Sequence, residues 1–568
     1  MAEQFFLTRG SEGLKKYSYP NCEIVKSVFD TPKRCSGVCM SNNGKYIAVC
    51  NGSETIVYDV EENKIVTTLA RSRTMLMAFS PKNTHLVTWR QYQVSEEFPE
   101  NTPNVEIWRL DAEPQQEKPA YGYVKRGQSL WEPLWSEDEK TCARACNAEV
   151  QFFEDNDFSK VAKRIQRDKV GGVFVAPGGE PYHVALYVPS IKGAHAFVQL
   201  YLYGSFEKTA AVAHRSFMKV DNLNIKFNKS GKCGIIIAAN DVDKTGSSYY
   251  GQTLLYFISI RGESNQIVLK KNGPVYSVEW NPAKDEFIVL YGFMPCKATL
   301  FNVKCDPIHE FGENHYNEIL FNPQGNMVGL CGFGNLRGKI KFYDMDSKKL
   351  LSDFVAPDTT YFEWAPSGDV FITGTLSPRL RQDNEFKLWD VCGKTLHHWR
   401  VPSDETQLWQ LKWINSATLL PPPPVPRPAT SKEIAASKPQ AYRPPGSRGK
   451  PAAATRSLLP NVNDGVYKPG SDASRNQPSK QAMKNQRKRE NKAKQNEEQN
   501  AKPEPTMQDL QSTIVDEKEK KIRNLKKKLN QIEKLKAQVS AGKALEKNQM
   551  DKIATENEII EEIKRLEI

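Results

Sequence analysis

The amino-acid sequence predicts an all-β fold, a nine-bladed WD-like β-propeller, followed by a disordered basic linker and a C-terminal α-helical hairpin. Three observations lead to this prediction. A short turn phrase recurs about every 47 residues in the first part of the 568-residue chain, a spacing typical of propeller blades. The composition changes abruptly at residue 421, and apolar residues return with a helical period after residue 513.

The turn phrase consists of an aromatic residue, a small or polar residue, proline, any residue, often glycine, and a polar residue. Proline fixes φ at the second turn position and Asn or Ser accepts a hydrogen bond at the first, so the phrase predicts a type I turn. Because a strand-like apolar run follows the copies, nine copies predict nine blades. Clear copies are at 364–369 (WAPSGD), 321–326 (FNPQGN), 280–285 (WNPAKD) and 79–83 (FSPKN), with weaker copies near residues 40, 135, 175, 227 and 413.

The blades are degenerate compared with WD repeats, because Trp389-Asp390 alone matches the dipeptide that names them. The last phrase, near Trp413, is followed by one short strand-like run before the prolines begin, so its blade lacks strands. Residues near 13–29 have the alternation of a strand pair with one buried face. We therefore expect these N-terminal strands to close the ring, which gives a propeller domain over residues 1–420.

Charge separates the two parts of the chain. The formal net charge is +12, and all of it falls in residues 421–568, whereas residues 1–420 are balanced. A basic tail on a neutral ring predicts an acidic partner for the tail.

Residues 421–510 are expected to form a linker. Its first eight residues, 421–428 (PPPPVPRP), predict a polyproline II segment, and the remainder is too poor in apolar residues to fold. The basic cluster within it contains no aromatic residue for base stacking, which favours sequence-independent phosphate contact, although a solvated spacer remains the alternative. The candidate RNA-binding residues of the tail are Lys484, Arg487, Lys488, Arg489, Lys492 and Lys494.

Residues 511–568 are expected to form a helical hairpin or coiled coil. Two runs of helically spaced apolar residues are separated by Gly542, which suits a left-handed helix cap. Their spacing does not distinguish a self-contained hairpin from a docking site for a partner. The runs are Ile522, Leu525, Leu529, Ile532, Leu535 and Val539, then Leu545, Ile553, Ile560, Ile563 and Leu566.

Motifs for chemistry are weak throughout. The 11 cysteines are scattered as expected for buried thiols, and neither they nor the eight histidines show metal-ligand spacing. Gly393-Lys394-Thr395 resembles the end of a phosphate-binding loop, but Leu388 occupies the position of the required glycine. The glycine-rich segment 332–338 favours a tight inter-strand turn, with a binding loop as the alternative. We expect no enzymatic activity, cofactor or metal, and, since no apolar run is long enough to span a membrane, a cytoplasmic chain without membrane association.

Four phrases connect this order of segments to a known family. They are GFGNLRG at 332–338, SPRLRQDN at 377–384, AYRPP at 441–445 and GVYKPG at 465–470. Together with the ring, the linker, the basic segment and the helices, they resemble the eukaryotic translation initiation factor 2A family over essentially the full chain. One component of initiation factor 3 has a similar ring but carries an N-terminal RNA-recognition domain.

The resemblance implies a translation initiation factor that binds the small (40S) ribosomal subunit. It implies codon-dependent, GTP-independent delivery of initiator methionyl-tRNA on particular mRNAs, with other initiation factors contacted through the C-terminal helices. On the ring, the repeat pattern places Arg337, Arg379 and Arg381 in inter-strand loops, which makes them the candidate contacts to RNA. The alternative is a non-enzymatic scaffold for protein assembly whose coiled-coil tail recruits partners.

Overall fold

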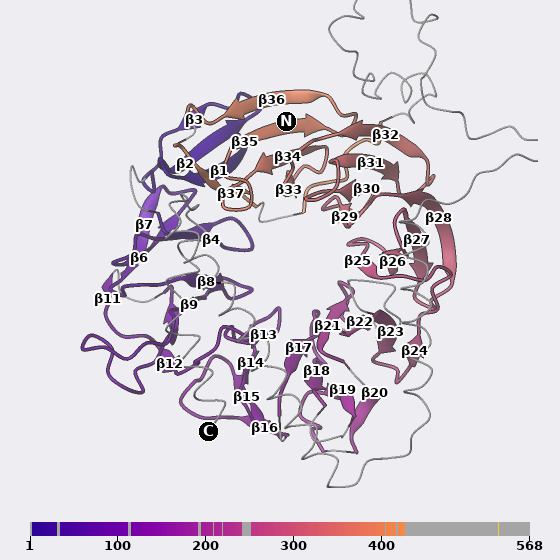
Figure 1. Ribbon diagram of the computed structural model, residues 1–568. Helices are drawn as coiled ribbons and strands as arrows, with labels where there is room; N and C mark the ends of the chain where they lie inside the picture. Colours follow the sequence, from indigo (N-terminus) through magenta and orange to yellow (C-terminus); the bar gives the residue numbers. More distant parts are fainter. Residues whose placement is uncertain are drawn as a thin grey trace, which may run out of the picture. The chain divides into compact units, whose positions relative to one another are not determined.

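The computed structural model describes residues 3–426 apart from 31–34, 112–114, 168, 191–194, 208, 219, 241–251, 404 and 416–418, together with Ile532. The predicted basic segment at 484–494 and, except for Ile532, the predicted helical hairpin lie outside the described residues. Within the described residues the chain forms nine antiparallel sheets arranged as a ring (Figure 1), which confirms the predicted nine-bladed propeller.

Each blade contains four strands numbered outward from the ring centre, and Figure 1 shows the first strand of every blade lining the centre. The first four blades consist of β4 Gly37–Met40, β5 Tyr46–Cys50, β6 Thr55–Asp59 and β7 Lys64–Leu69; β8 Leu76–Phe79, β9 His85–Trp89, β10 Val105–Arg109 and β12 Tyr121–Tyr123; β13 Leu134–Trp135, β14 Thr141–Ala145, β15 Glu149–Glu154 and β16 Lys163–Gln166; and β17 Gly172–Val175, β18 His183–Val188, β19 Ala196–Leu202 and β20 Ala211–Phe217.

The next four blades follow the same order along the chain. They consist of β21 Asn222–Phe227, β22 Cys233–Asn240, β23 Gln252–Ser259 and β24 Ser264–Gln266; β25 Val275–Trp280, β26 Glu286–Tyr291, β27 Cys296–Asn302 and β28 Pro307–Asn314; β29 Glu318–Phe321, β30 Met327–Gly332, β31 Lys339–Asp344 and β32 Leu350–Val355; and β33 Tyr361–Trp364, β34 Val370–Thr375, β35 Glu385–Asp390 and β36 Thr395–Arg400. A short extra strand, β11 Gln115–Gln116, pairs parallel with β7 of the first blade.

The ninth blade joins the two ends of the ring. Its innermost strand is β37 Leu408–Trp413, and the three outer strands come from the N-terminus: β1 Gln4–Gly10, β2 Gly13–Tyr19 and β3 Ile24–Val25. Phe6 pairs with Trp413 in the antiparallel register. The closure by N-terminal strands is as expected, but the expected range of 13–29 begins too late. It omits β1, which is the strand that pairs directly with β37.

Aromatic packing holds this closing blade. Phe6 is fully buried, and its ring lies 5.1 Å from Tyr17, 5.3 Å from Trp413 and 5.4 Å from Phe386 of the eighth blade. Buried aromatic pairs of this kind add to the stabilisation from apolar burial. The ends of the ring are therefore joined by both a strand ladder and a core.

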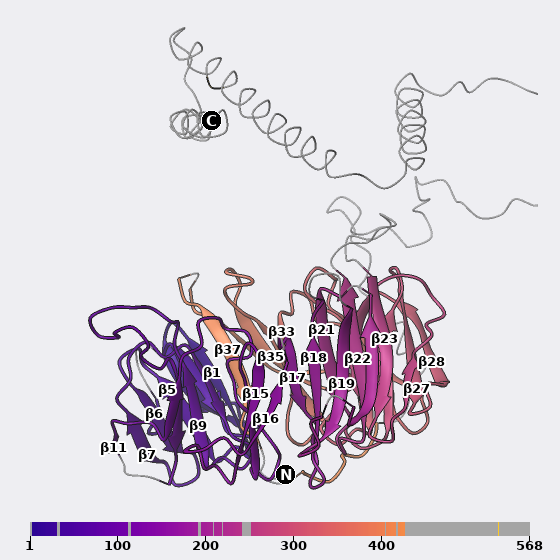
Figure 2. The ribbon, with the colours of Figure 1, turned by 90° about the horizontal axis from the view of Figure 1, so that it is seen from below.

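The strands run from one face of the ring to the other (Figure 2). The turn phrases directly follow the innermost strands, so they lie together on one side, which we call the turn face. Because the strands are antiparallel, the loops that join the second strand of a blade to the third lie on the opposite side, which we call the loop face.

The turn phrase also connects neighbouring blades. Asn281 Nδ2 donates to the Gly325 carbonyl at 3.1 Å, and Asn322 Nδ2 donates to the Gly368 carbonyl at 3.3 Å. Asn281 and Asn322 are buried, as are both acceptor glycines. The first polar residue of a phrase therefore also anchors the glycine of the next phrase around the ring.

No helix in the part of the chain that the structure describes is long and apolar enough to cross a membrane.

All 11 cysteines are free thiols. Burial raises the pKa of several of them, that of Cys35 to about 11. The buried cysteines, such as Cys35, therefore act as core residues of the ring.

Candidate functional site on the loop face

The three candidate arginines of the ring lie in corresponding loops of two neighbouring blades. Arg337 belongs to the loop between β30 and β31, and Arg379 and Arg381 belong to the loop between β34 and β35. Both loops join second and third strands, so both lie on the loop face. All three side chains are exposed, which makes their guanidinium groups accessible to a partner.

The β34–β35 loop has a fixed base. Ser377 donates its backbone N–H to the Leu408 carbonyl at 2.9 Å. Asn384, which is 1% exposed, donates to the Leu380 carbonyl at 2.7 Å and accepts a hydrogen bond from the Leu408 N–H at 3.0 Å. The buried asparagine thus ties the middle of the loop to its C-terminal end and ties the loop to the closing strand β37. The exposed tip, which contains Arg379 and Arg381, is held by this base.

The β30–β31 loop is the glycine-rich segment 332–338. The Gly338 N–H donates to the Gly332 carbonyl, and the Gly338 carbonyl accepts from the Ala356 N–H, both at 2.8 Å. Phe333 is buried and stacks on Phe362 with ring centroids 6.1 Å apart. The segment joins two strands, so no helix N-terminus is present there to hold a phosphate.

Arg379 bridges the two loops. Its guanidinium group lies over Gly334, where an added β-carbon would be 3.1 Å from Arg379 Cζ and closer still to Nη2. Gly334 has a φ of +71°, a conformation that favours glycine. Glu318 lies on β29, the innermost strand of the seventh blade. Burial raises the pKa of Glu318, and the positive charge of Arg379 partly offsets this rise.

Arg337 and Arg381 lie in the two loops that Arg379 bridges. No acidic side chain among the residues described in the ring forms an ion pair with either of them, whereas many other basic side chains of the ring are paired, such as Lys271 with Glu313 at 2.7 Å. Exposed arginines without a carboxylate partner among the described residues suit an external anion such as a phosphate group.

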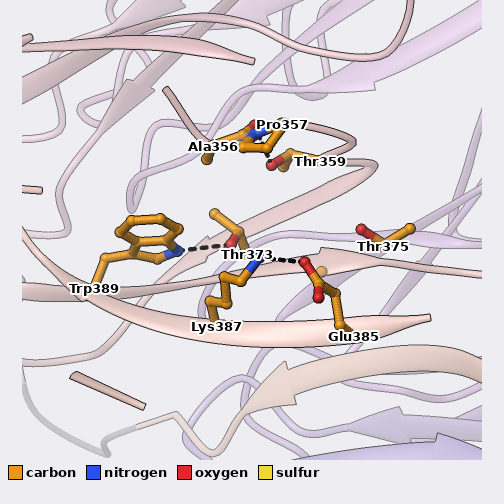
Figure 3. A pocket seen from close by; sticks show the side chains of 9 residues that line it. Ala356, Pro357, Thr359, Thr373, Thr375, Glu385, Lys387 and Trp389 are labelled. Carbon is orange, nitrogen blue, oxygen red and sulfur yellow. Dashed lines mark hydrogen bonds and ion pairs between the residues drawn. The ribbon is translucent and has the colours of Figure 1, made fainter. Parts of the chain in front are cut away.

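Beneath the β34–β35 loop lies a small cavity of about 10 Å³ (Figure 3), which is room for about one water molecule. Trp389 Nε1 donates to Thr373 Oγ1 at 2.8 Å across it, and Lys387 pairs with Glu385. The three candidate arginines lie on the exposed loops and do not line this cavity. The lining residues are Ala356, Pro357, Thr359, Thr373, Gly374, Thr375, Glu385, Lys387 and Trp389.

Two larger hollows lie on the turn face, and the sequence predictions did not include them. One, of about 560 Å³, contains His85, Arg109, Asp111 and Asp157, and the other, of about 570 Å³, contains Lys140, Glu154 and Glu180; Asp155 lines both. Carboxylates outnumber the basic groups in each hollow, so neither suits a phosphate. The acidic turns of the third and fourth blades were the sequence signal for these hollows.

Two exposed apolar side chains on the same face of the ring were also missed. Phe293, in the β26–β27 loop of the adjacent sixth blade, is 41% exposed, and Leu380, at the tip of the β34–β35 loop, is 39% exposed. No sequence signal distinguished these two side chains from core residues. The loop face of blades six to eight therefore combines three arginines with two exposed apolar groups.

The described residues thus form a nine-bladed β-propeller that carries three exposed arginines on the loop face of its seventh and eighth blades. The family model described as "Eukaryotic translation initiation factor eIF2A" matches residues 215–411, and the model described as "Eukaryotic translation initiation factor 2A C-terminal domain" matches residues 520–566. The chain is 34% identical to eukaryotic translation initiation factor 2A of Caenorhabditis elegans, covering 100% of this chain and 98% of that protein. It is 31% identical to the Drosophila melanogaster protein of the same name, covering 94% and 93%.

The chain thus belongs to the eukaryotic translation initiation factor 2A family and is a translation initiation factor. A solved structure titled "Crystal structure of the eukaryotic initiation factor" aligns with a TM-score of 0.66 and 25% identity, covering 73% of this chain and 99% of the other. A component of eukaryotic translation initiation factor 3 from Xenopus laevis is 23% identical over 66% of this chain and 53% of that protein.

Proposed function

We propose that this chain is a non-enzymatic initiation factor of the cytoplasm that binds the small (40S) ribosomal subunit through RNA phosphates. In this proposal it promotes codon-dependent, GTP-independent delivery of initiator methionyl-tRNA on particular mRNAs. The ring domain (1–420) supplies a rigid platform, the linker (421–510) supplies the basic segment, and the C-terminal helices (511–568) contact other initiation factors.

The observation that supports RNA contact on the ring is the position of Arg337, Arg379 and Arg381 on neighbouring loops. Guanidinium groups bind phosphate oxygens with paired N–H donors, and such contacts position RNA without reading its sequence. Phe293 on the adjacent blade adds an exposed aromatic face on which a single-stranded base can stack.

The tail would add sequence-independent affinity. Its six candidate residues carry no aromatic group among them, so their contribution is electrostatic and falls steeply with salt. The contributions of ring and tail can be separated by neutralising the three ring arginines and the six tail residues in turn.

The test measures binding of the full-length protein to purified 40S subunits and to single-stranded RNA at several salt concentrations. Each phosphate contact to single-stranded RNA contributes about −0.7 to the slope of log affinity against log salt. Replacing Arg337, Arg379 and Arg381 by alanine should therefore make the slope shallower by about 2, and neutralising the six tail residues should make it shallower by about 4.

The matched control replaces Lys304, Lys349 and Lys394 by alanine. These exposed lysines lie in the turns between the third and fourth strands of blades six, seven and eight, on the turn face. The control removes the same charge from the opposite face of blades six to eight and should leave the slope unchanged. An equal effect of both triple variants would show that net charge alone drives binding, and no association with 40S subunits at low salt would favour a scaffold for protein assembly.

A further inference from the structure

The proline-rich segment after the ring does not leave the turn face at once. The described chain continues past the expected domain boundary at residue 420 and contacts the turn phrase of the seventh blade. Gln324 Nε2 donates to the Leu420 carbonyl at 3.4 Å, and Asn326 Nδ2 donates to the Pro423 carbonyl at 3.1 Å. The two acceptors are three residues apart.

The donors are themselves fixed. Gln324 is 6% exposed and also donates to the Pro366 carbonyl at 2.9 Å. Asn326 Oδ1 accepts a hydrogen bond from Asn322 Nδ2 at 2.7 Å, which leaves the Asn326 amide nitrogen directed at the segment. The seventh blade thus presents two oriented amide donors to one edge of the proline-rich chain.

The segment has the chemistry of a polyproline II helix. Proline fixes φ near −65°, and a residue that precedes proline is restricted to extended conformations. Between residues 420 and 426 every residue is a proline or precedes one. A polyproline II helix has three residues per turn, so side chains three apart form one of three ridges.

The exposure of the segment follows this three-residue period. Leu420, Pro423 and Pro426 are half-buried and form the ridge that faces the ring. Pro421 and Pro424 form a second ridge, and Pro422 and Val425 form a third; all four side chains are exposed. The ring therefore holds one ridge and leaves two adjacent ridges free.

We propose that residues 419–426 are a recognition site for a partner domain that binds polyproline II helices in an aromatic-lined groove, as SH3 and WW domains do. Such domains grip a preformed helix that loses little conformational entropy on binding. Here the contacts from Gln324 and Asn326 hold the helix in place and present Pro421 and Pro424 outward.

The charge of the segment decides between partner classes. Residues 419–426 contain no charged side chain, so neither RNA phosphates nor anionic lipid headgroups would be attracted to this part of the chain. The exposed proline rings and Val425 offer an apolar, pre-shaped surface, and the partner of matching chemistry is a protein groove lined with aromatic rings.

The experiment titrates the full-length protein against a panel of purified, immobilised SH3, WW and EVH1 domains. One variant carries Pro421→Ala and Pro424→Ala on the exposed ridge. The control carries Pro423→Ala and Pro426→Ala on the ring-facing ridge, so it loses the same number of prolines and the same conformational restriction. Thermal unfolding of both variants establishes that the ring is intact.

We expect wild-type protein to bind at least one domain of the panel. The exposed-ridge variant should bind about tenfold more weakly or worse, because each substitution removes buried methylene groups from the complex. The control should stay within about threefold of wild type, because it changes the ridge that faces away from the partner. Equal weakening of both variants, no weakening of either, or no domain that binds the wild-type chain would each overturn the proposal.

Discussion

The guanidinium group of Arg379 lies over the α-carbon of Gly334 in the neighbouring blade, and it occupies the space that a β-carbon would need. Glycine at 334 thus serves two purposes: it adopts a φ of +71° and it makes room for the arginine of the next loop. The two loops of the candidate site are coupled through this contact.

We predict that Gly334→Ala weakens RNA binding as much as Arg379→Ala does, because the new methyl group displaces the guanidinium group. Backbone strain at positive φ should also cost about 1 kcal/mol of stability. Gly52→Ala is the control: Gly52 also has positive φ, at +96°, but no atom lies within 4 Å of an added β-carbon. Salt-dependent RNA binding and urea unfolding of both variants provide the measurements. If Gly52→Ala weakens RNA binding equally, the contact between the loops has no role in it.

Closure of the ring depends on Phe6. We predict that Phe6→Ala lowers the free energy of unfolding of the whole ring by about 3–5 kcal/mol, as expected for a fully buried aromatic side chain in a tight core. Met218→Ala should change it by less than about 0.5 kcal/mol, because Met218 is 83% exposed. Denaturant titrations followed by tryptophan fluorescence and by circular dichroism check this, and a ring that keeps its wild-type midpoint without the Phe6 ring would show that β1 is dispensable.

The inter-blade role of the turn phrase can be tested at Asn322. Its amide accepts from the Met327 N–H at 3.0 Å and donates to the Gly368 carbonyl of the next blade at 3.3 Å. Asn322→Ala leaves both groups unsatisfied in a buried position and should cost about 1–3 kcal/mol. Asn302→Ala, which removes a turn asparagine that accepts only from Lys304 and Asp306 of its own turn, should cost less. Equal destabilisation by the two changes, measured by thermal unfolding, would contradict an inter-blade contribution.

Acid should destabilise the second and third blades through His85. Burial lowers the pKa of His85, and the nearby carboxylate of Glu139 only partly opposes this shift. A histidine whose folded pKa lies below its unfolded value stabilises the ring above about pH 6.5, and this stability is lost as the pH falls through the folded pKa.

We therefore predict that wild-type protein loses more free energy of unfolding between about pH 7.5 and about pH 5.5 than the His85→Gln variant does. The exposed His214 provides the control, since His214→Gln should keep the wild-type pH dependence. Urea titrations at these pH values give the comparison, and identical slopes for the wild type and His85→Gln would exclude this role for His85.

Local chemistry made much of the ring predictable. Proline and glycine fix the turn phrase through φ restrictions that act within a few residues, so each phrase was predicted to be a turn between two strands. The missing strands after Trp413 indicated closure from the N-terminus. The strand β1 was missed because no phrase precedes it, and its burial depends on pairing with a strand far along the chain.

The candidate site was predictable only in part. The repeat pattern predicted that Arg337, Arg379 and Arg381 lie in loops between strands. The contact of Arg379 with Gly334 and the exposure of Phe293 depend on how neighbouring blades pack, which no local pattern encodes. The docking of Pro423 on Asn326 likewise required the fold to bring residues 97 positions apart together.

The closing blade has a consequence for synthesis of the chain. Arg9 on β1 and its partner Gln410 on β37 are separated by 401 positions. At about 5–20 residues per second, the first strands leave the ribosome about 20–80 s before the strand that completes their blade. During that interval β1 lacks the strand that pairs with its inner edge, and an unpaired strand edge is a template for pairing with other chains. The inner edge of β1 can be covered by its own partner only after residue 413 has been made.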